Sequence, residues 1–294
     1  MTIIGAGPGA GGFVRIQGVP HHVVVEGGGP VCVLSAGLAM SWYDWEPVVP
    51  LLTPHRTVVR FDRPGHGLSG PAQAPPTAAG EAHRIAALLD ALGLTAPATV
   101  VGHSIAGFHA EAFARLYPER TEGVVLVDSS TEPRARASSA PAVRTGATRA
   151  LATALAAAGI PALLGPVARR ALVRASRARR AHDPAPTPLV RRTYRTTRVL
   201  RGTLLENSSY LAVAAELLAL RDTHPLPSDL PLTVLAAYDG RPTHPSVHWL
   251  DRQRDLADVL AARFEIVAGA GHLLMLDRPE RVAEAVLCQT RVLV

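Results

Sequence analysis

Short apolar runs rich in β-branched residues alternate with segments of helical apolar spacing along most of this chain. The first run, residues 13–27, is broken at Gly18 and Pro20 and predicts a β-hairpin. Further strands are predicted at residues 31–37, 57–67, 98–104, 123–130, 231–239 and 264–272, and helices at residues 77–94, 108–120, 247–262 and 279–287. This alternation predicts an α/β fold with a mostly parallel eight-stranded sheet flanked by helices, in which the hairpin is the antiparallel edge.

The length of 294 residues and the apolar content of 48% fit one large domain with an insertion better than two independent domains. The pattern places the core in residues 13–130 and 231–294, after a flexible tail at residues 1–12. Residues 131–230 follow the sixth strand and predict a helical, arginine-rich lid. The uncharged part of this lid, residues 150–168, is rich in alanine and contains glycine and proline. It would make a weak membrane span, so we expect a pair of lid helices over an apolar pocket.

Basic charge is concentrated in the predicted lid. All thirty basic residues of the chain are arginine, and residues 131–230 hold sixteen of them against six acids, a formal charge of +10, while the rest of the chain carries −4. Such a surface either steers an anionic or carrier-bound small-molecule substrate toward the active site, or is simply a solvated face. No DNA- or RNA-binding motif accompanies the arginines, which argues against a nucleic-acid partner.

The remaining local signals exclude several classes of protein. Cys32 and Cys288 are too few for a disulfide framework or a cysteine metal site. The first twelve residues have neither the basic nor the apolar region of an export signal, so we expect a cytoplasmic protein. Residues 3–9 match a glycine-rich dinucleotide-binding opening, but β-branched residues interrupted by Gly18 and Pro20 follow where a helix is required. We therefore expect no cofactor and no metal.

The strongest chemical signal is Gly102-His103-Ser104-Ile105-Ala106, which lies between an apolar strand and a helix. A serine hydroxyl is a weak nucleophile, so a nucleophilic serine must project from a tight turn beside a base. Gly102 and Ala106, two residues before and after Ser104, are small enough for that turn. Small residues are frequent in this chain, so this pattern gains weight only from other motifs in the right order.

Four motifs in order resemble the α/β-hydrolase family. They are Ser35–Trp45 after the third strand, Asp62–Ser69 after the fourth, the Ser104 turn, and Gly269–His272 followed by Leu276–Glu280. In the first of them, Ala36-Gly37 stands where the family usually has His-Gly. The resemblance runs from about Phe13 to the C-terminus and implies the α/β-hydrolase fold with a lid after the sixth strand.

The resemblance also implies a serine, a histidine and an acid acting together. His272 is the expected base for Ser104, because among twelve histidines it alone follows the last strand in a glycine-rich loop. The acid has two candidates. Asp239 ends the strand at 231–239, but the usual acid position falls on Gly240. Asp128 ends the preceding strand without a shift, although many relatives carry a non-catalytic aspartate there; the sequence leans to Asp128 and leaves both open.

By the same resemblance, the backbone N–H groups of Leu38 and Ile105 form the oxyanion hole. Candidates for the wall of the substrate pocket are Gly37, Trp42, His103 and Leu273. Core packing is an equal alternative for Trp42.

The predicted function is that of a serine hydrolase that cleaves a carboxylic ester, thioester or lactone through an acyl-enzyme on Ser104. The same residues would serve an acyltransferase or cyclase if the lid excludes water, and serine-bearing relatives also cleave C–C bonds or act as lyases. A ligand-binding module with retained but slow residues is the alternative from another class. The intact Ser104 and His272 argue against it. A serine nucleophile also argues against dehalogenases and epoxide hydrolases, which use aspartate.

Overall fold

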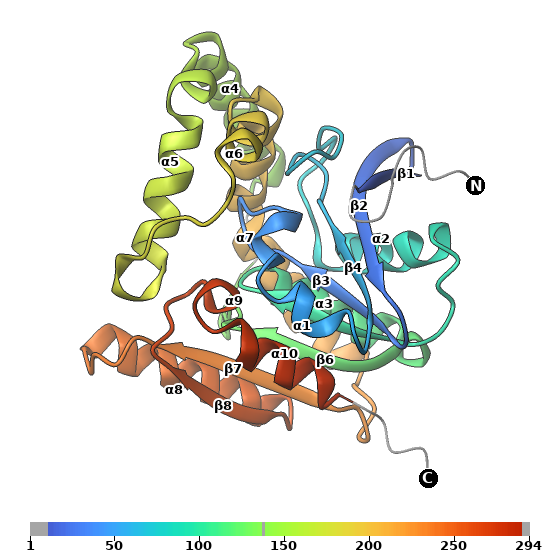
Figure 1. Ribbon diagram of the computed structural model, residues 1–294. Helices are drawn as coiled ribbons and strands as arrows, with labels where there is room; N and C mark the ends of the chain where they lie inside the picture. The colour runs from blue at the N-terminus through green and yellow to red at the C-terminus, as the bar shows by residue number, and fades with distance from the viewer. Residues whose placement is uncertain (1–10, 137–138, 290–294) are drawn as a thin grey trace.

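One sheet of eight strands forms the centre of the molecule, and helices cover both of its faces (Figure 1). The computed structural model describes residues 11–136 and 139–289. The strands are β1 Gly12–Ile16, β2 Val19–Gly27, β3 Val31–Ser35, β4 Thr57–Phe61, β5 Ala98–His103, β6 Thr121–Val127, β7 Leu232–Tyr238 and β8 Arg263–Ala268. Their order is β1-β2-β4-β3-β5-β6-β7-β8. Only β1–β2 and β2–β4 pair antiparallel, so the predicted mostly parallel sheet with a hairpin edge is confirmed.

The helices of the core fall near their predicted positions, with two short exceptions. The core helices are α1 Val49–Leu52, α2 Ala78–Ala91, α3 Ala106–Leu116, α8 His244–Val259, α9 Leu274–Asp277 and α10 Pro279–Leu287. Short 3-10 turns lie at Trp42–Trp45, Pro118–Arg120 and Ala178–Arg180. The two helices that the sequence pattern did not predict, α1 and α9, have four residues each, too few for a helical period to be recognised.

The inner strands are buried on both faces because successive side chains point to opposite sides of the sheet. In β5, Val100 belongs to the apolar cluster under α2, α3 and α8, whereas Val101 belongs to the cluster under α1 and α10. Parallel strands also place their carboxyl ends at one edge of the sheet. The loops after β5, β6 and β8, which carry Ser104, Asp128 and His272, are therefore brought together.

Four helices lie between β6 and β7: α4 Pro141–Ala157, α5 Ile160–Ser176, α6 Thr187–Tyr194 and α7 Thr197–Thr223. We call them the insertion. In Figure 1, α4, α5 and α6 gather at the upper left, on one side of the sheet. The uncharged stretch 150–168 is divided between α4 and α5 at Gly159, whose φ is +73°. Within the described ranges, no single helix is long and apolar enough to cross a membrane, and only α4 and α5 taken together, bent by 102°, pass that test.

Many arginines of the insertion bind groups within the protein rather than standing free in solvent. Within the described ranges, the arginines that donate hydrogen bonds to carbonyl, hydroxyl or carboxylate oxygens include Arg144, Arg149, Arg169, Arg170, Arg177, Arg195, Arg198 and Arg221. Part of the basic charge therefore holds the insertion together and against the core. The glycine-rich residues 3–9 and most of the expected tail lie outside the described residues.

Candidate active site

Ser104 lies in the tight turn between β5 and α3, in the left-handed backbone region with a φ of +54°. This conformation costs free energy for a non-glycine residue, and residues held in it are often found at active sites. Gly102 makes the turn possible, because a Cβ there would lie 2.2 Å from the carbonyl oxygen of Ala106. The Ser104 N–H donates to the Val127 carbonyl oxygen over 3.2 Å. The backbone thus fixes the serine at the carboxyl edge of the sheet.

Ser104, His272 and Asp128 form a continuous chain of hydrogen bonds. His272 Nδ1 lies 2.6 Å from Asp128 Oδ2, and His272 Nε2 lies 3.1 Å from Ser104 Oγ. Because Nδ1 faces a carboxylate, it carries the ring proton, and Nε2 is left to accept the serine proton. The Asp128 side chain is 3% exposed and that of His272 38% exposed, so the acid is buried while the base reaches solvent.

Two further donors hold the Asp128 carboxylate. Its Oδ1 accepts hydrogen bonds from the Ala237 N–H and from the indole N–H of Trp249, each over 2.8 Å. These two hydrogen bonds fix the orientation of the carboxylate. Trp249 belongs to α8 and was not among the residues singled out from the sequence, since no motif marks it.

Asp239, the other candidate acid, lies elsewhere. Its Oδ1 accepts from the Arg241 N–H over 2.9 Å, and its Oδ2 lies 4.0 Å from the Arg241 side chain. Within the described chain it has no hydrogen bond with His272. The structure therefore brings Asp128, and not Asp239, to the histidine.

The loop after β3 is held from behind by Arg63. The guanidinium donates to the carbonyl oxygens of Ala36 and Gly37, the second over 3.0 Å. Glu206 of α7 in turn accepts two hydrogen bonds from Arg63, over 2.9 and 3.0 Å. Burial acts to raise the pKa of Glu206, but Arg63 and the neighbouring His66 outweigh it and lower this pKa to about 2. This buried ion pair fixes the loop in which the family's usual histidine is replaced.

Two backbone N–H groups are left without acceptors beside the serine. Neither the Leu38 N–H nor the Ile105 N–H donates a hydrogen bond to the described residues. Gly37 allows the two segments to approach, because a Cβ there would lie 3.1 Å from Ser104 Cβ and 2.6 Å from His103 Nδ1. A pair of free donors beside a nucleophile is the arrangement that stabilises an oxyanion.

Comparison with known proteins agrees with this geometry. A family model described as the alpha/beta hydrolase fold matches residues 29–279. The chain belongs to the α/β-hydrolase family. It is 36% identical over 124 residues to the putative carbamate hydrolase RutD of Caulobacter sp. (strain K31), covering 40% of this chain and 45% of that protein. It is 33% identical over 106 residues to the pimeloyl-[acyl-carrier protein] methyl ester esterase of Xylella fastidiosa (strain M12), covering 36% and 39%.

Among solved structures, the enol-lactonase from Burkholderia xenovorans LB400 matches with a TM-score of 0.63 and 22% identity over 94% of this chain and 98% of that one. The alignments span less than half of the length of the two curated relatives. The names of both curated relatives describe hydrolytic enzymes, and the solved structure, at 22% identity, supports the fold.

A cavity of about 180 Å³ opens beside the Ser104 hydroxyl of this α/β hydrolase. Leu38, His103, Ser104, His272 and Leu273 line it, with Leu172 and Val173 of α5 opposite. Of the residues predicted to form the pocket wall, His103 and Leu273 line this cavity. Gly37 does not line it, which corrects that prediction; it packs closely against His103 and Ser104, where a Cβ would find no room.

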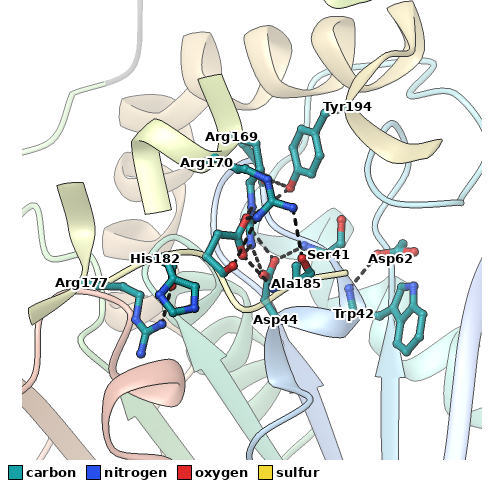
Figure 2. Close-up of polar contacts among 12 residues, drawn as sticks. Ser41, Trp42, Asp44, Asp62, Arg169, Arg170, Arg177, His182, Ala185 and Tyr194 are labelled. Atoms are coloured by element: carbon teal, nitrogen blue, oxygen red, sulfur yellow. Dashed lines mark hydrogen bonds and ion pairs between the residues drawn. The ribbon is translucent and has the colours of Figure 1, made fainter. Parts of the chain in front are cut away.

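Trp42 does not line the Ser104 cavity, which corrects its assignment to the pocket wall. Its backbone N–H donates to Asp62 Oδ1 over 2.9 Å (Figure 2), and its ring packs against His22 and Arg60. Trp42 therefore belongs to the packing around the Asp62 loop, the alternative that the sequence left open.

His103 supports the base from the side. Its Nε2–H donates to the backbone carbonyl oxygen of His272 over 2.8 Å. Burial, with the neighbouring His272, lowers the pKa of His103 well below its ordinary value, so the ring stays neutral. A neutral His103 positions the His272 loop without adding a second positive charge next to the base.

The insertion holds the loops on both sides of the serine in this member of the α/β-hydrolase family. Figure 2 shows the Arg169 guanidinium of α5 between Asp44 and Tyr194; it also pairs with Asp183, and the Tyr194 hydroxyl donates to the Ala39 carbonyl oxygen. The loop that carries the Leu38 N–H is thereby fixed to α5 and α6.

The loop that carries His272 is fixed in a similar way. Asp277 Oδ2 accepts from the N–H of Gly271 over 2.9 Å and from the N–H of Ala178 over 2.7 Å, while its Oδ1 accepts from Arg177 over 2.7 Å. Within the described ranges, no group of three or more metal-ligating side chains comes together.

Proposed function

We propose that this hydrolase cleaves a carboxylic ester, thioester or lactone through an acyl-enzyme on Ser104. The observation that carries the proposal is the hydrogen-bond chain from Asp128 through His272 to Ser104, which ends beside the free N–H groups of Leu38 and Ile105. This arrangement contains each group that acyl transfer to a serine requires.

In the first half-reaction, Ser104 Oγ attacks the carbonyl carbon while His272 Nε2 takes the hydroxyl proton. The carbonyl oxygen becomes an oxyanion that accepts hydrogen bonds from Leu38 and Ile105. Asp128 stabilises the resulting imidazolium and keeps its orientation. His272 then gives the proton to the departing alkoxide or thiolate, and the acyl group remains on Ser104.

In the second half-reaction, His272 takes a proton from water, which attacks the acyl carbon. His272 then gives this proton to Ser104 Oγ as the acyl–oxygen bond breaks, which releases the acid and restores the free serine. The 38% exposure of the His272 side chain supports water as the acceptor rather than a bound alcohol or amine. The same exposure favours hydrolysis over the acyltransferase alternative. The assembled chain of hydrogen bonds argues against a binding module without turnover.

Labelling with a fluorophosphonate, followed by the mass of the intact chain, tests this proposal. One adduct is expected on the wild-type protein and none on Ser104→Ala. The protein is also assayed on ester, thioester and lactone substrates before and after labelling. Activity should fall in proportion to the fraction of protein that carries the adduct. Absence of an adduct on folded protein, or an adduct that persists in Ser104→Ala, contradicts the assignment of the nucleophile.

A further inference from the structure

A second cavity, of about 220 Å³, lies between α5 and the segment formed by α6 and α7. Its apolar lining includes Ile160, Leu164, Ala168, Leu172, Val199 and Leu200. Ala39, Arg169 and Leu172 line both this cavity and the one beside Ser104. The two hollows are therefore neighbours that share one wall.

The second cavity offers no free charge to a ligand. Arg169 is the charged residue in its lining, and its guanidinium is 2% exposed and paired with Asp44 and Asp183. The Tyr194 hydroxyl is likewise engaged, because it donates to the Ala39 carbonyl oxygen. A carboxylate or ammonium group placed there would lose its hydration without gaining a partner.

Large apolar side chains are left in contact with water along this wall. Leu164 is 52% exposed and Leu172 is 56% exposed, although both line the cavity. An apolar group placed against them would remove their surface from water, which is favourable in proportion to the area covered.

We propose that this cavity is a chain subsite, which binds an uncharged apolar chain of the substrate while the reacting carbonyl lies at Ser104. The inference rests on the proposed function, because it takes Ser104 as the position of the reacting carbonyl. The wall shared with the Ser104 cavity, the lack of a free charge in the lining and the exposed leucines select an aliphatic chain rather than an anionic or carrier-like group at this position.

Chain-length dependence of hydrolysis tests the chain subsite. The substrates are p-nitrophenyl alkanoates from acetate to decanoate, which vary the acyl side, and n-alkyl acetates, which vary the alcohol side. Each methylene that enters the subsite should raise kcat/KM by about two- to fourfold. In at least one series, kcat/KM should therefore rise at least about tenfold between four and eight carbons. A flat profile in both series overturns the inference.

Two neighbouring leucines provide matched variants. Leu164 lines the cavity, whereas Leu163 is 70% exposed and absent from the lining. In Leu164→Asp, the ratio of kcat/KM for octanoate to that for acetate (or for octyl to ethyl acetate) should fall at least about tenfold. In Leu163→Asp it should stay within about twofold of wild type. Equal changes in the two variants contradict the subsite.

A binding measurement separates this inference from the proposed function. Octan-1-ol is titrated calorimetrically into Ser104→Ala protein, which cannot react, with and without Leu164→Asp. Binding that weakens at least about fivefold in the double variant supports the subsite even if the wild type neither hydrolyses esters nor reacts with fluorophosphonate, in which case the proposed function fails alone. If the wild type hydrolyses acetate esters but shows no chain-length dependence, and Ser104→Ala protein does not bind octanol, then the subsite alone is overturned.

Discussion

Arg63 donates a hydrogen bond to the carbonyl oxygen of Gly37 over 3.0 Å, on the side of that peptide opposite to the Leu38 N–H. The carbonyl and N–H of a trans peptide point in opposite directions, and the described residues contain no cis peptide. Holding the Gly37 carbonyl therefore also holds the direction of the Leu38 N–H. Arg63 is thus placed to position the proposed oxyanion hole, and Glu206 keeps its guanidinium in place.

Replacing Arg63 should lower kcat more than it raises KM. An oxyanion donor acts mainly in the transition state, and loss of one costs about 100- to 1000-fold in kcat. We expect Arg63→Met to lose about 10- to 100-fold in kcat, with KM within about threefold, and Arg63→Lys to recover part of the loss. Steady-state kinetics on a short ester give both constants. A rise in KM at unchanged kcat would assign Arg63 to substrate binding instead.

Glu206→Gln separates loop positioning from simple stability. It leaves the Arg63 charge buried with its main ion-pair partner removed, so the free energy of unfolding should fall by about 3 kcal/mol or more. Activity is therefore compared at a temperature where circular dichroism shows both proteins folded. A loss of kcat under those conditions supports the positioning role, whereas full activity in the folded variant would limit Glu206 to stability.

The two candidate acids give a paired test. Asp128→Asn should lower kcat by about 1000- to 10,000-fold, because an amide cannot keep His272 in the required tautomer or stabilise its cation. Asp239→Asn should change kcat by less than about twofold, since Asp239 bonds to Arg241 and not to His272. Both are measured on the same ester. Comparable losses in the two variants would refute the assignment of Asp128.

Trp249→Phe should lower kcat by about tenfold. The change removes the indole N–H from Asp128 Oδ1, and a hydrogen bond to a charged group contributes about 1.5–3 kcal/mol. Trp42→Phe is the control, because Trp42 lies outside the Ser104 cavity. Steady-state kinetics on the same ester should give Trp42→Phe a kcat within about twofold of wild type. Equal kinetic effects would show that the loss comes from general packing.

The sequence predicted those parts of the site that depend on local patterns. Ser104 and His272 follow apolar strands within small-residue loops, and the sheet that joins them follows from the alternation of strands and helices. The choice between Asp128 and Asp239 depended on a one-residue shift in a strand end, which a pattern of apolar residues does not resolve. β6 and β7 lie side by side, and it is the aspartate after β6, Asp128, whose Oδ2 lies 2.6 Å from His272 Nδ1.

The supporting contacts could not be predicted, because they join residues that are distant along the chain. Glu206 reaches Arg63 from a helix of the insertion, across 143 positions, and no spacing rule connects them. Trp249 reaches Asp128 across 121 positions. Conversely, Trp42 follows the loop after β3 in sequence but lies toward Asp62 instead of the Ser104 cavity, since the 3-10 turn at Trp42–Trp45 redirects the chain.

Because of His109, we expect the free energy of unfolding to fall in mild acid. It is fully buried in α3, and neither ring nitrogen has a hydrogen-bond partner among the described residues. Burial lowers its pKa from 6.5 to about 4, with Glu81 and Glu206 acting to raise this pKa and Arg63 and Arg84 acting to lower it.

The unfolded chain therefore binds a proton at His109 below about pH 6.5, while the folded protein does so only near pH 4, and the free energy of unfolding falls as the pH drops through this window. The full contribution is about 3 kcal/mol. His109→Leu cannot be protonated at this position. We therefore expect its free energy of unfolding, relative to wild type, to be higher at pH 4.5 than at pH 7 by about 2–3 kcal/mol. Urea unfolding at both pH values measures this difference, and His55→Gln, at an exposed position, is the control. If wild type and His109→Leu lose stability in parallel between pH 7 and pH 4.5, then His109 is not the group that titrates, and the acid sensitivity has to come from another buried base.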